Sequence, residues 1–171
     1  MKVAISGASG FVANALKKAF PDFVVIERND DIAKIVEKLH GVEAVFNLAG
    51  APIVARWDEA YKKVLYSSRI DTTKKVVEAI NQSGVSHFIS TSAVGIYPNN
   101  IPCDETTTPL GSDFLGKLAH DWEMEAQKCQ KTTTILRFGI VLGPNGGALE
   151  KMLPPFKLGL GGTISDGSMI S

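Results

Sequence analysis

Residues 2–13 read KVAISGASGFVA, and this stretch decides the fold. Its first half is a short run of mostly apolar and β-branched side chains, which predicts a buried strand that ends at Gly7. A helical pattern begins at Phe11, so the spacing of Gly7, Gly10 and Ala13 falls on a strand-to-helix turn. Such a turn points free N–H groups and the helix dipole at a bound phosphate, and glycines let a pyrophosphate approach closely. An ordinary turn without a ligand is the alternative.

The rest of the chain repeats this alternation of strand and helix. Each predicted strand is apolar through its length, which is typical of a parallel sheet covered on both faces. The sequence therefore predicts an α/β fold of the doubly wound Rossmann type, with a mainly parallel sheet and helices on both faces. The expected strands are 2–6, 23–27, 43–48, 85–91 and 133–142, and the expected helices are 11–20, 32–39, 58–82 and 112–128, the last with Ser112 as its N-cap.

Composition excludes several classes of protein. The 171 residues carry 18 basic and 18 acidic side chains, so there is no net positive charge to attract nucleic acid. No apolar run approaches the roughly 20 residues that span a bilayer, and the N-terminal apolar stretch is too short for a signal peptide. Cys103 and Cys129 lack metal-ligand spacing and indicate no disulfide. We therefore expect one cytoplasmic domain without a nucleic-acid or membrane partner and without a metal.

The end of the second predicted strand distinguishes the two nicotinamide dinucleotides. Glu27 could bind the ribose 2′-hydroxyl of NAD, and Arg28 beside it could accept the 2′-phosphate of NADP. Either side chain could instead be a solvated charge at a strand end. We favour NADP as the cofactor, with NAD as the alternative.

Several stretches occur in a fixed order along the chain. They are ISGASGFV at 5–12, NLAGAPI at 47–53, RWDEAYKKVLYSSRIDTT at 56–73, STSAVGIY at 90–97 and LRFGIVLGPNGGALEKMLPPFKLGLGG at 136–162. They resemble the extended short-chain dehydrogenase/reductase superfamily. More narrowly, they resemble its nucleotide-sugar epimerase branch, some members of which carry a cell-division-inhibitor label. The resemblance covers essentially the whole chain.

This resemblance implies a NAD(P)-dependent epimerase or oxidoreductase that acts by hydride transfer on a nucleotide sugar or a related small molecule. It places Ser92 at the family's catalytic serine, whose hydroxyl would polarise the substrate oxygen; a turn-capping serine is the alternative. The cofactor-binding residues that we expect are Gly7, Ser9, Gly10, Phe11 and Val12 in the glycine turn, Arg28, Leu48, Ala49 and Gly50 beside the adenosine half, Lys117 at the nicotinamide ribose, and Ile140 beside the nicotinamide.

The acid–base pair of the superfamily is altered in this chain. Its general acid is the tyrosine of Y-x-x-x-K, and Lys117 fits the lysine, but Asp113 stands where the tyrosine belongs. Aspartate ionises near pH ~3.9 and tyrosine near ~10, so an ionised aspartate is no proton donor unless burial neutralises it. Asp113 and Lys117 could instead form an i,i+4 ion pair on one helix face. Tyr97 could serve as the acid, or could simply pack over the site.

This altered pair supports a second interpretation, in which the protein binds the dinucleotide without turnover, as a redox sensor or a regulatory partner. A further departure is the interval between Arg28 and Phe46, which has room for one helix only. Extended members have another strand there, so we expect the edge of the sheet and part of the adenine pocket to be missing.

The C-terminal segment is rich in glycine, since half of the 16 glycines lie in residues 139–171. Extended members are about twice the size of a single domain, with a substrate pocket built partly from a later segment. We therefore expect residues 1–150 to form a NAD(P)-binding domain, and 151–171 to begin an incomplete substrate-binding lobe that is mobile after about Pro155. The substrate and the oligomeric state stay open, with a homodimer as one option.

Overall fold

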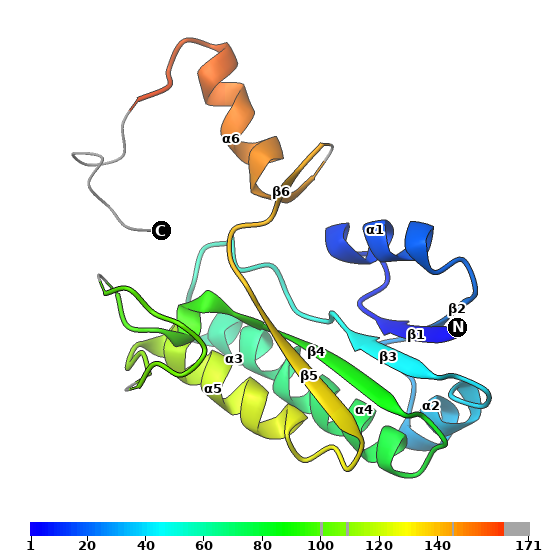
Figure 1. Ribbon diagram of the computed structural model, residues 1–171. Helices are drawn as coiled ribbons and strands as arrows, with labels where there is room; N and C mark the ends of the chain where they lie inside the picture. The colour runs from blue at the N-terminus through cyan, green and yellow to red at the C-terminus, as the bar shows by residue number, and fades with distance from the viewer. Residues whose placement is uncertain (100, 109, 145, 163–171) are drawn as a thin grey trace.

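Five parallel strands form one sheet in this computed structural model, which describes residues 1–99, 101–108, 110–144 and 146–162. The strand order is β2–β1–β3–β4–β5 (Figure 1). Their bounds are Val3–Ser6 for β1, Phe23–Ile26 for β2, Ala44–Asn47 for β3, His87–Ala93 for β4 and Thr132–Phe138 for β5. Because β1 lies between β2 and β3, the chain leaves the centre in both directions, as in a doubly wound sheet.

Helices cover both faces of the sheet, as the sequence predicts. Helix α1 lies on one face, and α2, α4 and α5 lie on the other (Figure 1). The helices are α1 (Phe11–Ala19), α2 (Ile32–Lys38), α3 (Glu59–Ser67), α4 (Ile70–Asn81), the short 3-10 turn η1 (Val94–Ile96), α5 (Phe114–Ala126) and α6 (Gly147–Lys157), with the short strand β6 (Leu142–Gly143) before the last.

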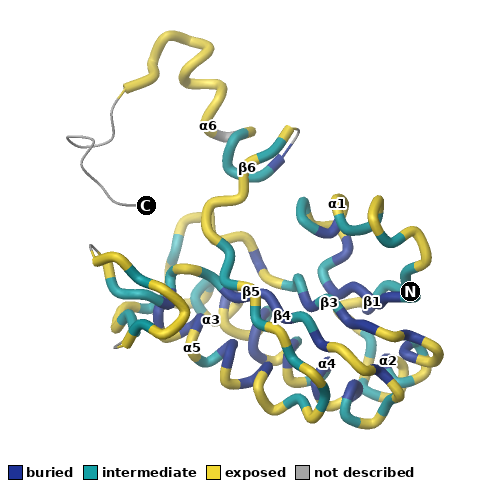
Figure 2. The backbone as a smooth tube through the Cα atoms, viewed as in Figure 1, coloured by how far each residue is buried: buried dark blue, intermediate teal, exposed yellow. Residues whose placement is uncertain are grey.

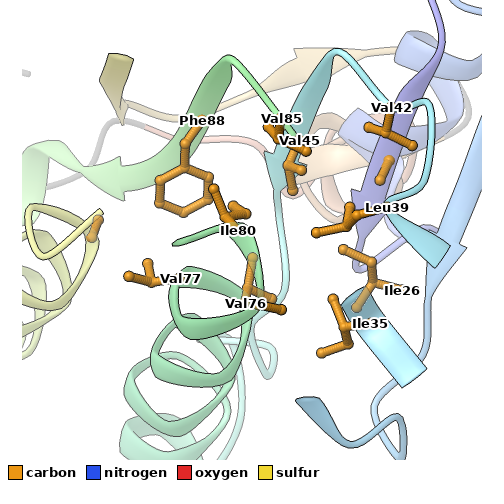
Figure 3. Packing of buried hydrophobic residues seen from close by; sticks show 13 residues of the cluster. Ile26, Ile35, Leu39, Val42, Val45, Val76, Val77, Ile80, Val85 and Phe88 are labelled. Carbon is orange, nitrogen blue, oxygen red and sulfur yellow. The ribbon is translucent and has the colours of Figure 1, made fainter. Parts of the chain in front are cut away.

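The larger core fills the space between the sheet and helices α2 and α4. Phe88 and Val45 from the sheet pack against Ile35 of α2 and Ile80 of α4, and all four are fully buried (Figure 3). A smaller core on the other face packs Val3 and Ile5 and neighbouring strand residues under α1. Each fully buried aliphatic side chain stabilises the fold by roughly 1.5–3 kcal/mol, so these two layers fix the register of the strands.

The prediction of one long helix over 58–82 is wrong, because the structure has two helices there, α3 and α4. In a continuous helix the carbonyl of Leu65 would accept the backbone N–H of Arg69. Instead, the Ser68 hydroxyl and the Arg69 guanidinium donate to that carbonyl, at 3.1 and 3.2 Å. The Arg69 N–H bonds to the Tyr66 carbonyl, which tightens the turn and ends α3. Two side chains therefore replace a helical hydrogen bond, which the apolar spacing does not reveal.

Two other boundaries also differ. The strand predicted over 133–142 ends at Phe138, because its partner strand ends at Ala93, where the chain turns into η1. The sequence does not predict helix α6, which continues through Pro154 and Pro155.

Helix α6 stands away from the sheet, and it is partly buried over residues 147–149 and exposed over 152–157 (Figure 2). Residues 163–171 of the expected substrate-binding lobe lie outside the described residues, as does most of the segment expected to be mobile. Among the helices that the structure describes, none has the length and apolarity that crossing a membrane requires.

Candidate functional site

A cleft of about 450 Å³ opens at the carboxyl ends of β1, β2 and β3. This is where the strand order reverses and where ligands bind in open α/β sheets. The volume is within the range of small-molecule pockets, roughly 300–1,000 Å³. The lining includes Ser6, Gly7, Ser9, Gly10, Lys17, Glu27, Arg28, Leu48, Ala49, Gly50, Ser68, Thr72 and Lys75.

The glycine turn forms the floor of this cleft. Gly7 has a φ of 71°, which favours glycine, and its N-terminal neighbour Ser6 ends β1. A Cβ atom at Gly7 would lie 2.7 Å from the carbonyl oxygen of Leu48, so glycine also lets the turn touch the next loop. Gly10 is the N-cap of α1, and no side chain caps the helix. The first N–H groups of α1 therefore have no partner within the helix and can bind an anion.

The wall opposite β2 is the loop that follows β3, residues 48–51. Two groups at the junction of α3 and α4 hold it in place. The Ser68 hydroxyl accepts a hydrogen bond of 3.0 Å from the Ala51 N–H, and the Arg69 guanidinium donates one of 3.0 Å to the Ala51 carbonyl. Both bonds end at Ala51, so the junction of α3 and α4 fixes this end of the loop.

Positive charge gathers where β2 ends. Arg28 is exposed there, and Lys75 of α4 reaches across to donate to the carbonyls of Arg28 and Asp30, at 2.9 and 2.8 Å. Asp30 forms an ion pair of 2.5 Å with Lys38 and does not line the cleft. The cleft lining therefore contains Lys17, Arg28 and Lys75 against the single carboxylate of Glu27, a surplus that suits a phosphate.

A buried polar network ties together the elements beneath the cleft. Asn47 is fully buried, its side-chain oxygen accepts from the Ser6 hydroxyl at 2.6 Å, and its nitrogen donates to the Thr73 hydroxyl at 2.8 Å. The Trp122 indole N–H also donates to Thr73, at 2.8 Å. The network links β1, β3, α4 and α5, and because its members satisfy one another it costs little to bury.

A second polar cluster lies where β4 and β5 extend beyond the other strands. The Ser92 hydroxyl donates to Glu123 of α5 at 2.6 Å, and Arg137 of β5 donates to both oxygens of Glu123, each at 2.8 Å. Arg137 also donates to the Tyr97 hydroxyl at 2.7 Å and stacks on its ring. Burial pushes the pKa of Glu123 upward, but the hydrogen bonds from Arg137 and Ser92 outweigh burial and hold it below its usual value.

Asp113 and Lys117 do not join this cluster. Asp113, rather than the predicted Ser112, is the N-cap of α5, where its carboxylate accepts the Gly116 N–H at 2.7 Å. The ion pair considered between Asp113 and Lys117 is absent from the part of the chain that the structure describes, because the carboxylate caps the helix instead. Both side chains are exposed.

The structure separates the expected site residues into groups. Gly7, Ser9, Gly10, Arg28, Leu48, Ala49 and Gly50 line the cleft together. Phe11, Val12, Lys117 and Ile140 are not among its lining residues, and Ile140 is 72% exposed. The Phe11 ring instead packs against Gly143 and Gly146, where any larger residue would collide with it.

Four residues near these sites were missed from the sequence: Arg69, Lys75, Glu123 and Arg137. Lys75 lies on a helix that is distant in sequence from β2, so no local pattern marks it. Arg137 is a charged residue within the apolar segment TILRFGIV, a weak signal of a buried pair, whereas Arg69 and Glu123 stand among polar residues that give no such signal.

The model of the NAD dependent epimerase/dehydratase family matches residues 3–158 of this chain. A protein named epimerase family protein SDR39U1 homolog, chloroplastic, from Arabidopsis thaliana is 32% identical, and the alignment covers 98% of this chain and 56% of that protein. Epimerase family protein SDR39U1 of Mus musculus is 31% identical, with 98% of this chain and 64% of that protein covered. The chain thus spans 56% to 64% of the length of these relatives.

Solved structures give the same result. The crystal structure of human epimerase family protein SDR39U1 (isoform 2) with NADPH superposes with a TM-score of 0.82 at 31% identity, covering 98% of this chain and 63% of that one. UDP-glucuronic acid 4-epimerase from Bacillus cereus, solved with UDP-glucuronic acid and NAD, has a TM-score of 0.76 at 19% identity, covering 92% of this chain and 63% of that one. This second likeness concerns the fold.

Proposed function

Because this chain belongs to the NAD dependent epimerase/dehydratase family, we propose that it binds NADP(H) in the cleft beyond β1, β2 and β3 and transfers hydride to or from a nucleotide sugar or a related small molecule. The observation that carries the proposal is the meeting of three features in one cleft. These are the uncapped N-terminus of α1, the loop after β3 and the cationic end of β2.

The donors in the cleft fit an anionic dinucleotide. Backbone N–H groups at the start of α1 would bind the pyrophosphate, with Gly7 and Gly10 leaving room for it. Arg28 and Lys75 would hold a 2′-phosphate, which supports NADP over NAD, and the human relative was solved with NADPH. When bound, the nicotinamide accepts and returns hydride. The chain's own task is to bind, orient and supply a proton.

Tyr97 is better suited than Asp113 to supply that proton. The Tyr97 oxygen accepts a hydrogen bond from Arg137, so its own proton is free to go to a substrate oxygen. Asp113 is occupied as a helix cap. Ser92 donates its proton to Glu123, so it would have to rotate away to polarise a substrate. Lys117 retains the role at the nicotinamide ribose that the resemblance implies.

Direct titration tests the cofactor. NADPH and NADH are added to the full chain while the fluorescence of its two tryptophans is followed. We expect saturable binding of both, with NADPH the tighter. Absence of binding by either dinucleotide at millimolar concentration would contradict the proposal.

A second candidate function is binding of the dinucleotide without turnover, in a sensor or regulatory role. It is favoured by the use of Asp113 as a helix cap and by the engagement of Ser92 with Glu123. Single-turnover absorbance at 340 nm with a panel of nucleotide sugars distinguishes the two. Hydride transfer that Ser92→Ala abolishes would establish the enzyme, and absence of transfer despite tight NADPH binding would establish the sensor.

A further inference from the structure

Arg69 is a buried cation directly behind the wall of the cleft. It lies at the junction of α3 and α4 and is 8% exposed. Every ion pair found in residues 1–99, 101–108, 110–144 and 146–162 involves other residues. A charge in this situation is costly, because burial removes its water and no opposite charge compensates it.

The partners of Arg69 are all neutral. Its guanidinium donates to the carbonyls of Leu65 and Ala51 at 3.2 and 3.0 Å, and it stacks on the Trp122 ring with 5.3 Å to the centroid. These contacts satisfy hydrogen-bond donors but leave the net charge unbalanced. Burial accordingly lowers the pKa of Arg69. If Arg69 served only to join the loop 48–51 to α3 by hydrogen bonds, a positive charge would not be needed, since a neutral amide can also donate to carbonyls.

Two residues that line the cleft, Gly50 and Ser68, lie against this charge. A Cβ atom at Gly50 would lie 3.1 Å from the Arg69 Cζ atom and 3.4 Å from Nε. Gly50 itself lines the cleft, and the same loop touches the glycine turn, where Leu48 approaches Gly7. The guanidinium thus faces the cleft through one layer of backbone. Because the guanidinium is buried, solvent and salt screen its charge less than they would screen a charge on the surface.

We propose that Arg69 is a buried counter-charge for the pyrophosphate of the bound dinucleotide, acting across Gly50 without touching the ligand. This inference rests on the proposed function, because it names the part of the dinucleotide that completes the charge balance of the same site. The pyrophosphate is the group common to NADPH and NADH. Arg69 therefore contributes to the affinity for both dinucleotides and does not discriminate between them.

Three substitutions separate charge from shape. Arg69→Met removes the charge and keeps much of the stem, Arg69→Gln removes the charge and keeps amide donors for the two carbonyls, and Arg69→Lys keeps the charge. We expect both neutral variants to bind NADPH and NADH about tenfold more weakly, by a similar factor for each. Arg69→Lys should stay within about threefold of wild type. Arg28→Met is the matched control, because it should weaken NADPH far more than NADH.

Circular dichroism and thermal melting of each unliganded variant accompany the titrations, and Arg69→Gln carries the test if Arg69→Met fails to fold. Binding by the folded neutral variants within about twofold of wild type overturns the inference. It is also overturned if Arg69→Lys loses as much affinity as Arg69→Gln, since Arg69 would then act through its shape. Failure of wild type to bind either dinucleotide is a different result, which removes the proposed function itself.

Discussion

The Ser92 hydroxyl on β4 donates a 2.6 Å hydrogen bond to Glu123 on α5. Glu123 is 6% exposed and accepts from two nitrogens of Arg137, which in turn donates to Tyr97. Ser92 and Tyr97, the two candidates for catalysis, are therefore connected through one ion pair, in which the carboxylate is buried and the guanidinium is partly exposed. This pair fixes where both hydroxyl groups point, so its loss should affect stability and geometry together.

Glu123→Ala should be strongly destabilising, because it leaves the Arg137 guanidinium without its partner. Breaking a fully buried pair from one side costs about 3–5 kcal/mol, and because the Arg137 side chain is 22% exposed we expect a smaller loss of stability here. Urea denaturation followed by circular dichroism measures the change. The double variant Glu123→Leu with Arg137→Met removes both charges and should recover part of the loss. If the double variant is as unstable as the single one, an uncompensated charge is not the cause.

The Glu123 carboxylate should also make the stability of the fold depend on pH. Its pKa is lower in the folded protein than the ordinary value of 4.5, so the unfolded chain takes up its proton at higher pH. The ionised Glu123 therefore contributes its full stabilisation above pH 4.5. This stabilisation is lost as the pH falls from 4.5 towards the pKa of Glu123 in the folded protein. Urea midpoints at several pH values, for wild type and Glu123→Gln, isolate this effect. The difference in urea midpoint between wild type and Glu123→Gln should become smaller as the pH falls. A difference that stays constant would show that the ionised Glu123 is not the source of this stability.

Much of the fold could be predicted from residues near one another in sequence. Gly7 and Gly10 mark the turn, the apolar strands indicate a parallel sheet, and the short interval after Arg28 indicates the missing strand. The structure confirms that one helix, α2, joins β2 to β3. Each of these features depends on a local pattern of backbone preference and hydrophobic spacing.

The candidate site was harder to predict because its contacts join distant segments. Lys75 reaches the end of β2 from α4, and the Glu123–Arg137 pair joins α5 to β5. No periodicity in the sequence marks such pairs. Asp113 shows a related difficulty, since the sequence could place it opposite Lys117 but could not show that its carboxylate caps the helix instead.

Thr73→Val should destabilise the network beneath the cleft. The substitution preserves shape but removes the hydroxyl that accepts from Asn47 and from the Trp122 indole, so the indole N–H loses its partner and the Asn47 amide keeps only a 3.4 Å bond to Ser90. Each unpaired group costs about 1–3 kcal/mol. Thr73→Ser retains the hydroxyl and loses only a methyl group, so it should be the milder change in thermal and urea denaturation. Equal effects of the two variants would show that packing, rather than hydrogen bonding, is the main role of Thr73.

Gly7→Ala should impair both the fold and the cleft, and Gly41→Ala is its matched control. Both glycines have nearly the same φ, 71° and 70°, so alanine at either position costs about 1–2 kcal/mol in backbone strain. A Cβ atom at Gly41 meets nothing within 4 Å, whereas one at Gly7 meets the Leu48 carbonyl oxygen at 2.7 Å. Gly7→Ala must therefore also push the glycine turn away from the loop of Gly50.

We expect Gly7→Ala to lower the urea midpoint more than Gly41→Ala does. Of the two variants, only Gly7→Ala should weaken NADPH binding in fluorescence titration. If both variants bind NADPH as wild type does, the contact between the turn and this loop does not shape the dinucleotide site.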